Sequence, residues 1–171
     1  MHSIGDFERI SDHAVSIVKV AKEIHEKKLK FSDEAQAGLE IMMNALREII
    51  NNATLSFINN DAKLAAKVEP LEQVINRLRD KLKEAHIERL TNGECTIELG
   101  FVFSDLITNL ERVADHCSNI AIGVIETNHN GYEPHEYLHE LKNSDDLQYN
   151  ADYMEYKKKY ALTAVVNKES K

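Results

Sequence analysis

A short phrase rich in charged residues occurs twice in this chain of 171 residues. Residues 6–13 read Asp-Phe-Glu-Arg-Ile-Ser-Asp-His, and residues 109–116 read Asn-Leu-Glu-Arg-Val-Ala-Asp-His. Each copy places a glutamate four positions before an aspartate, and residues four apart lie one above the other on a helix. Stacked carboxylates repel each other unless water or a cation screens their charge. The repeat therefore predicts two candidate sites for a metal ion, formed by Glu8 with Asp12 and by Glu111 with Asp115.

A third pair has the same spacing. Glu72 and Asn76 are four residues apart in a segment whose apolar residues recur with helical periodicity. At about 100° per residue, all three pairs lie to one side of the apolar stripe of their own segment. We expect them on solvated faces that meet at a groove between packed helices. Their oxygen atoms suit a hard or borderline cation such as iron, manganese, magnesium or calcium, and Asn76 supplies a neutral oxygen where an aspartate would add charge.

The same residues admit a simpler interpretation, in which each pair belongs to an ordinary solvated face. His13 and His116 follow the two motif aspartates but lie about 100° further round the helix. That position favours pairing with a neighbouring carboxylate or the backbone over metal ligation. Glu136 and His139 match half of a di-iron bundle signature, but they stand alone in the tail. No glycine-rich phosphate loop and no nucleophile–base pair is visible, so the sequence favours a protein that is not an enzyme.

Composition excludes several classes of partner. The chain carries 21 Lys and Arg against 29 Asp and Glu, a formal net charge of −8. Sequence-independent binding of nucleic acid relies on clusters of Lys and Arg, so an acidic chain is a poor candidate for it. No apolar run approaches the roughly 18 residues that a membrane-spanning helix needs. We therefore expect this chain to be soluble as given, while it could still be a piece of a larger membrane protein.

The periodicity of apolar residues predicts an all-α fold. Four long helices are expected, each bounded by capping or turn residues, at residues 4–29, 32–58, 62–90 and 96–126. Pro70 lies inside the third segment and should kink it, or start it afresh, near residues 68–69. A helix of about 30 residues is about 45 Å long. These segments therefore predict an elongated antiparallel helical bundle with short C-terminal helices.

The last forty residues differ from the rest because they contain all six tyrosines. We expect one short helix at residues 134–142 and a second at 149–160, where four tyrosines recur at helical spacing. A tyrosine stripe of this kind docks on a surface, since each ring buries apolar area while its hydroxyl stays hydrated. The bundle itself is the favoured surface, and a missing partner is the alternative.

The quoted phrases resemble the PhoU phosphate-uptake regulator family. Further segments are similar to the C-terminal PhoU-like domain of bacterial Na+/phosphate cotransporter family proteins. They are residues 68–78 (VEPLEQVINRL), 86–90 (HIERL), 92–95 (NGEC), 105–121 and 135–142 (HEYLHELK). The resemblance covers nearly the whole chain, and it implies a bundle built from three-helix repeats.

The resemblance also implies metal clusters, because members carry Glu/Asp-xxx-Asp motifs on adjacent helices of each repeat. Carried over residue by residue, it assigns six metal-binding positions, Glu8, Asp12, Glu72, Asn76, Glu111 and Asp115. Asn76 departs from the aspartate that the family has at this position, so we expect this site to bind a metal more weakly.

The domain organisation that the resemblance implies is a PhoU-like bundle over residues 1–130 and a tail over 131–171. Residues 1–30 match the last helix of a preceding repeat, and residues 32–130 match a complete three-helix repeat. The helix that should carry the partner motif of the first pair would lie upstream. We therefore expect the chain to be a fragment, whose first helix covers its apolar stripe with the other helices or with a second copy of the chain.

The function implied is that of a metal-binding regulatory or accessory domain of a Na+-dependent phosphate transporter, with no catalytic residues. The expected partner is the membrane portion of the same polypeptide, which would place the domain at the cytoplasmic face of the membrane. A homodimer is also expected, and phosphate is a candidate ligand of the metal. Two alternatives stay open, a helical scaffold without metal and a ferritin-like di-metal carboxylate enzyme.

Overall fold

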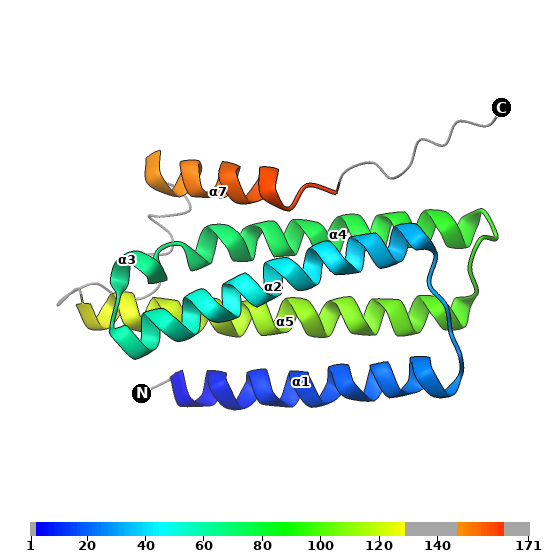
Figure 1. Ribbon diagram of the computed structural model, residues 1–171, viewed down its shortest axis with the longest axis horizontal. Coiled ribbons are helices and arrows are strands. Elements are labelled where there is room, and N and C mark those ends of the chain that lie inside the picture. Colours follow the sequence, from blue (N-terminus) through cyan, green and yellow to red (C-terminus); the bar gives the residue numbers. More distant parts are fainter. Residues whose placement is uncertain (1–2, 129–146, 163–171) are drawn as a thin grey trace.

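The computed structural model describes residues 3–128 and 147–162, and all regular structure in these two stretches is α-helix. Figure 1 shows an elongated bundle of helices that run back and forth along one axis. The helices are α1 (Ser3–Glu26), α2 (Asp33–Asn59), α3 (Ala62–Ala65), α4 (Val68–Thr91), α5 (Ile97–Asn128) and α7 (Leu147–Lys159). The expected all-α antiparallel bundle is confirmed. The short helix expected at residues 134–142 lies outside the described residues.

Local capping explains where the long helices begin and end. Ser32 caps α2, because its side chain accepts a hydrogen bond from the backbone N–H of Ala35. Asn60 ends α2 in the left-handed region, at φ 50 and ψ 43. Gly93 follows α4 with φ +72, a conformation that a side chain would strain. Each of these residues marks a boundary that the sequence predicts.

The expected break near Pro70 is present. A separate helix, α3, is capped by Asp61, whose carboxylate accepts from the N–H groups of Lys63 and Leu64. This helix ends at Ala65, and α4 begins at Val68, so Pro70 falls in the first turn of α4. Proline is tolerated there because the first turn has no intrahelical acceptor for its missing N–H.

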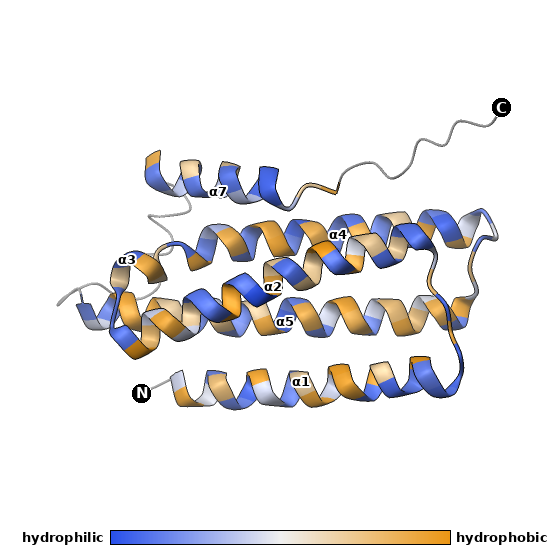
Figure 2. Cartoon of the chain, in the orientation of Figure 1, coloured by the Kyte–Doolittle hydropathy of each residue, from blue (hydrophilic) through white to orange (hydrophobic). Residues whose placement is uncertain are grey.

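The core lies between α2, α4 and α5. Figure 2 shows hydrophobic stretches along all three helices. The largest fully buried apolar side chains come from all three helices and include Met42, Ile49, Leu71, Ile75, Phe103 and Ile107. Burying a side chain of this size stabilises the fold by about 1.5–3 kcal/mol. This shared core holds α4 and α5 side by side, which is the arrangement that the predicted metal pairs require.

Helix α1 lies at the edge of the bundle, alongside α5 (Figure 1). Only Val20 of this helix is fully buried, while Ile4, Val15 and Val18 remain exposed. The chain therefore covers part of the apolar stripe of α1 with its own α5. The expected homodimer stays a prediction.

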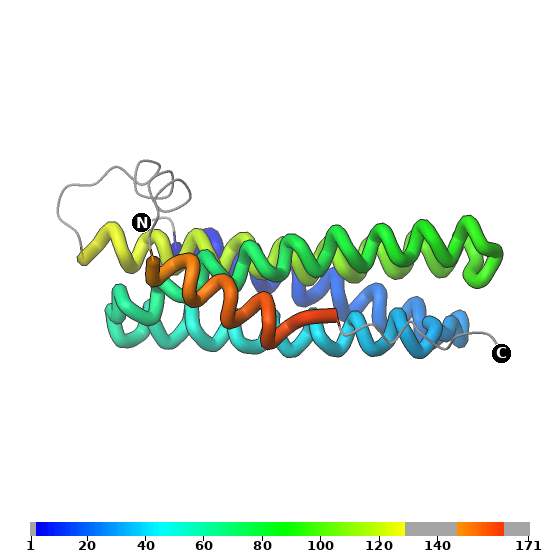
Figure 3. Tube along the Cα trace, turned by 90° about the horizontal axis from the view of Figure 1, so that it is seen from above, coloured from blue at the N-terminus to red at the C-terminus, as the bar shows by residue number. Residues whose placement is uncertain are grey.

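Helix α7 lies on the opposite side, against α4 (Figures 1 and 3). Tyr156 and Tyr160 of this segment are buried in the bundle. The Tyr160 hydroxyl donates to Glu48 of α2, and Lys159 Nζ lies 2.8 Å from Glu48 Oε2. The tyrosine stripe thus docks on its own bundle, as the favoured interpretation predicts.

None of the helices in the described part of the chain combines the length and apolar composition needed to cross a bilayer.

Candidate functional site

The two copies of the repeated phrase pack against each other, one on α1 and one on α5. His116 Nδ1 lies 3.0 Å from Asp6 Oδ1, and His13 Nδ1 lies 3.0 Å from Asn109 Oδ1. The last residue of each phrase thus contacts the first residue of the other. The two imidazole rings stack between them, with centroids 5.6 Å apart. The phrases are therefore related by an approximate twofold axis. His116 pairs with a carboxylate, as expected, whereas His13 pairs with the side-chain amide oxygen of Asn109.

A buried hydrogen bond marks the register in which the antiparallel helices α4 and α5 pack. The Ser118 hydroxyl of α5 donates to Oε2 of Glu69 on α4, and both residues are buried. Moving three residues along each helix from this bond brings Glu72 level with Asp115. One helical turn further, the same register brings Asn76 level with Glu111. The structure therefore aligns the predicted pairs of these two helices along their shared interface.

Glu111 is buried, with 5 % of its surface exposed. The helical-wheel expectation of a solvated position is wrong for this residue, because α4 covers it. Its carboxylate accepts a hydrogen bond from Arg79 of α4, which also pairs with Asp80 at 2.8 Å. Burial, followed by repulsion from Asp115, raises the pKa of Glu111 despite the attraction of Arg79 and other nearby cations.

Glu72 is buried as well, which again differs from the expected solvated face. The amide nitrogen of Asn76 donates to Glu72 Oε1. The carbonyl oxygen of Asn76 is buried and has no hydrogen-bond partner in the described part of the chain. A buried acceptor without a partner is costly, so this oxygen is a candidate metal donor.

Asp115 lies at the edge of the same interface. It is partly exposed, and its Oδ2 lies 3.2 Å from Nη1 of Arg112 one turn earlier. The arginines of this region therefore neutralise two of the motif carboxylates, Arg79 at Glu111 and Arg112 at Asp115. Pairing of Arg112 with an acid on an adjacent turn follows from helical spacing. The pairing of Arg79 has no signal in the sequence, since it depends on the register between two helices.

Glu8 and Asp12 are exposed on α1. No described helix lies beside α1 in the position that α4 takes beside α5. The structure therefore does not bring this pair to carboxylates of a neighbouring motif. More generally, no group of three or more His, Cys, Asp and Glu side chains within residues 3–128 and 147–162 is arranged to hold a metal ion. A metal at the α4–α5 interface thus needs side chains to move.

The donor set at α4 and α5 fits a hard cation in its chemistry. Glu72, Glu111 and Asp115 supply carboxylates, and Asn76 supplies the buried carbonyl oxygen without a partner. Arg79 stands against the fit, because its guanidinium already occupies Glu111. A bound cation would take over the charge neutralisation that Arg79 supplies.

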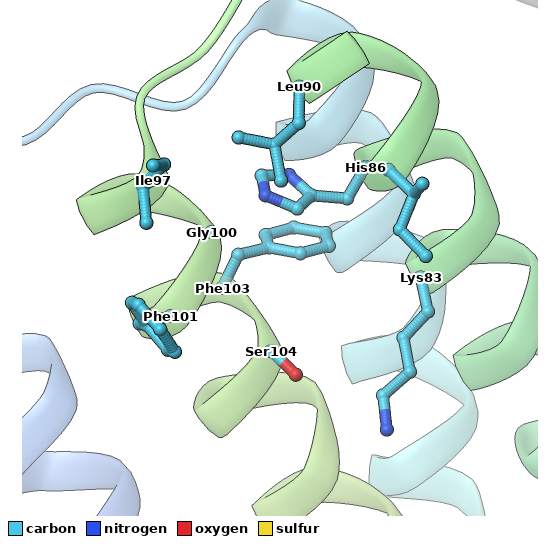
Figure 4. Close-up of a pocket in the computed structure, with 9 residues that line it drawn as sticks. Lys83, His86, Leu90, Ile97, Gly100, Phe101, Phe103 and Ser104 are labelled. Carbon is cyan, nitrogen blue, oxygen red and sulfur yellow. The ribbon is translucent and has the colours of Figure 1, made fainter.

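A separate apolar pocket opens near the other end of α4 and α5 (Figure 4). His86 stacks on Phe103 with ring centroids 5.1 Å apart, and its Nε2 lies 4.0 Å from Cys95 Sγ. Burial and the nearby Arg89 lower the pKa of His86. A Cβ atom at Gly100 would lie 2.8 Å from His86 Nε2, so only glycine fits there without a shift. This pocket carries no carboxylate and is unrelated to the predicted metal pairs.

Residues 39–124, which run from α2 through most of α5, match the PhoU domain family model. This match covers half of the chain and includes the α4–α5 interface. The chain belongs to the PhoU domain family. Its membership confirms the family resemblance, while the resemblance to cotransporter domains stays a prediction.

This PhoU domain is 31 % identical over 121 residues to phosphate-specific transport system accessory protein PhoU homolog 1 of Thermotoga maritima. It is 28 % identical over 120 residues to the PhoU homolog of Streptococcus pneumoniae serotype 4. These matches cover 71 % and 70 % of the chain, but 51 % and 54 % of the two relatives. The chain thus spans about half the length of the curated relatives it matches. No solved structure matches it significantly.

Proposed function

We propose that this PhoU domain is a metal-binding regulatory domain that acts on phosphate transport and is not itself an enzyme. The observation that carries the proposal is the α4–α5 interface, where Glu72, Asn76, Glu111 and Asp115 lie in matched register. The buried Asn76 carbonyl oxygen without a partner supports a cation at this position. The Thermotoga and Streptococcus relatives are both named as accessory proteins of phosphate-specific transport, which supports the regulatory role.

In this proposal the cation is iron or another hard or borderline metal ion, held by the two carboxylates of α5 together with Glu72 and Asn76. Burial and then repulsion from Asp115 raise the pKa of Glu111, and such an ion would screen that repulsion. It would also bridge α4 and α5 at this interface. Phosphate is a candidate further ligand, because a cation bound by few protein oxygens keeps positions open for it.

The finer part of the proposal places the domain on a Na+-dependent phosphate transporter, whose membrane portion would belong to the same polypeptide. The domain would then lie at the cytoplasmic face of the membrane. The packing of α1 supports an additional partner segment, since Glu8 and Asp12 are the twofold counterparts of Glu111 and Asp115. A helix beside α1, from an upstream segment or a second copy of the chain, would bring partner residues to this pair.

Metal stoichiometry tests whether the α4–α5 interface binds a metal ion. We would reconstitute the protein with iron or manganese, desalt it, and measure retained metal by mass spectrometry. Retained metal in the wild type should be lost in Glu111→Ala/Asp115→Ala. The matched control is Glu84→Ala/Glu88→Ala, which removes two exposed carboxylates with the same spacing on α4.

Two further variants use the observed contacts. Asn76→Asp adds a negative donor and should raise metal affinity. Arg79→Met removes the competing guanidinium and should raise it as well. If neither variant nor the wild type retains metal, the metal part of the proposal is wrong. The helical scaffold then becomes the better description, because Arg79 and Arg112 already neutralise the motif carboxylates.

Transport assays test whether the domain belongs to a Na+-dependent phosphate transporter. The natural reading frame should encode a membrane portion upstream of this domain. Membrane vesicles carrying that full polypeptide should take up radiolabelled phosphate in a Na+-dependent manner, and Glu111→Ala/Asp115→Ala should change the rate. A reading frame without membrane helices would contradict the cotransporter context while leaving metal binding intact. Oxidation of ferrous iron catalysed by the purified domain would instead favour the ferritin-like enzyme.

A further inference from the structure

A cleft of about 380 Å3 lies between α4 and the C-terminal half of α7. Helix α4 contributes Arg77 and Lys81, four residues apart on one face, and α7 contributes Tyr153 and Lys157 with the same spacing. Val74 and Leu78 of α4 add apolar side chains to the lining. We call this feature the α4–α7 cleft. None of its lining residues belongs to the predicted metal pairs.

All charged side chains that line the α4–α7 cleft are cations, although the chain as a whole has a net charge of −8. Arg77, Lys81 and Lys157 form no ion pair with any carboxylate in the described parts of the chain. Glu48, which accepts from Tyr160 of the lining, is held by that hydroxyl and by Lys159. Like charges gathered in one cleft repel one another, and a bound anion would relieve that repulsion.

The ring of Tyr153 positions two of these cations. The guanidinium carbon of Arg77 lies 4.8 Å from the ring centroid, and Lys157 Nζ lies 6.0 Å from it. The ring therefore joins a cation of α4 to a cation of α7. The Tyr153 hydroxyl is buried and has no hydrogen-bond partner in the described residues. A buried hydroxyl without a partner is unfavourable, and a shift of the ring towards the cleft would let the hydroxyl donate to an oxygen of a ligand.

We propose that the α4–α7 cleft binds the phosphate group of a small phosphorylated molecule. Phosphate suits a site with one guanidinium and two ammonium groups, because arginine binds it through paired hydrogen bonds and lysine as a point charge. The cleft volume falls at the lower end of the range of about 300–1,000 Å3 that is typical of small-molecule sites. Room therefore remains beside the phosphate for a second phosphate or an organic group, which Val74 and Leu78 would contact. This site goes beyond the proposed function and does not depend on metal.

Isothermal titration calorimetry with a chelator present tests the proposal without interference from metal. The probes are pyrophosphate, adenosine monophosphate and orthophosphate, and sulfate at matched ionic strength is the anion control. We expect saturable binding of at least one phosphate probe, tighter than that of sulfate. Tighter binding of pyrophosphate indicates a polyphosphate ligand, and tighter binding of adenosine monophosphate indicates an organic phosphate.

Variants of one lysine locate the site. Among the described residues, the ring of Tyr153 on α7 contacts Arg77 and Lys157 but not Lys81. Lys81→Glu should therefore weaken phosphate binding by about tenfold or more, the loss of one charge-assisted hydrogen bond. Lys158→Glu makes the same charge change on α7 at a position that does not line the cleft, and it should change affinity by less than about twofold. Lys81→Arg should retain binding. Circular dichroism of each variant confirms that the bundle is folded.

Three results would overturn the proposal. The first is the absence of saturable binding of any phosphate probe to the folded wild type. The second is sulfate binding as tight as that of every phosphate probe, which would reduce the cleft to a general cationic patch. The third is an equal loss of affinity in Lys81→Glu and Lys158→Glu, which would place the bound anion elsewhere. None of these results bears on metal retention at Glu111 and Asp115, so failure of this inference is distinguishable from failure of the proposed function.

Discussion

His116 and Asp6 lie 110 positions apart in the chain and join α5 to α1, with Nδ1 of the histidine 3.0 Å from Oδ1 of the aspartate. His13 and Asn109 make the equivalent contact in the opposite direction, also at 3.0 Å. The repeated phrase is therefore more than a repeat in sequence, because each copy recognises the other. Because each histidine contacts the first residue of the other phrase, both phrases need a histidine at their last position.

Removal of the Asp6 carboxylate should loosen α1. Asp6 accepts hydrogen bonds from both His116 and Asn119, and its side chain is only 14 % exposed. We expect Asp6→Ala to lower the free energy of unfolding by about 1–2 kcal/mol. Urea denaturation with a chelator present measures the change. Asp12→Ala is the matched control, since its exposed carboxylate forms no hydrogen bond or ion pair with α5, and it should stay within about 0.5 kcal/mol of the wild type. Equal effects of the two variants would contradict the role of Asp6.

The raised pKa of Glu111 makes stability depend on pH in a defined direction. The folded protein holds this proton more tightly than the unfolded chain, whose ordinary value is 4.5. The contribution of Glu111 to the free energy of unfolding therefore falls as the pH rises from 4.5 through the raised pKa. Glu111→Gln lacks this titration, so its stability relative to the wild type should increase over that interval. Denaturant titrations from pH 4 to 7 measure the difference, with the exposed Glu88→Gln as control. A difference that does not vary with pH would contradict the prediction.

Gly100 allows His86 to pack on Phe103 (Figure 4). A Cβ atom there would lie 2.8 Å from His86 Nε2, so Gly100→Ala forces the imidazole to move. We expect a loss of about 1–3 kcal/mol from overpacking, partly offset by the higher helix propensity of alanine. Gly5→Ala is the control, because nothing lies within 4 Å of its added Cβ and it should be neutral or stabilising. Thermal denaturation compares the two variants. A Gly100→Ala variant more stable than the wild type would show that His86 leaves room for a Cβ atom at position 100.

Docking of α7 should depend on its buried tyrosines. Tyr156 has 7 % of its surface exposed, whereas Met154 on the same helix is 58 % exposed. Tyr156→Ala should release α7 while the core of α2, α4 and α5 stays folded. Hydrogen exchange followed by mass spectrometry should then show loss of protection confined to α7 (residues 147–159) and the α4 surface beneath it. Met154→Ala should leave protection unchanged. Global loss of protection in Tyr156→Ala would mean that α7 is part of the cooperative core.

The two cysteines should differ in reactivity. Burial raises the pKa of the Cys117 thiol to about 12, whereas Cys95 is only half-buried. The thiolate is the reactive species, so iodoacetamide at pH 8 should alkylate Cys95 and leave Cys117 unmodified. Peptide mass spectrometry before and after unfolding in guanidinium measures both sites. Rapid alkylation of Cys117 in the folded protein would show that α5 opens readily at this position.

The sequence by itself determined the long helices and most of their ends, although α1 ends at Glu26 and not at residue 29 as expected. Ser32, Asn60 and Gly93 act through their own backbone and side chains within one turn, so their effects are readable from local residues. Pro70 likewise placed the break between α3 and α4. The four-residue spacing of each carboxylate pair also follows from the helix alone. Family membership rests on the sequence match over residues 39–124.

Only the tertiary structure decided what those residues contact. The helical wheel predicted Glu72 and Glu111 as solvated, but both are buried because the register of α4 on α5 covers them. The pairing of Arg79 with Glu111 and the cationic α4–α7 cleft have the same origin. Register depends on how side chains from distant segments interdigitate, and one helix does not contain that information. The sequence therefore set the spacing of the charged groups, and packing between helices determined which of them meet.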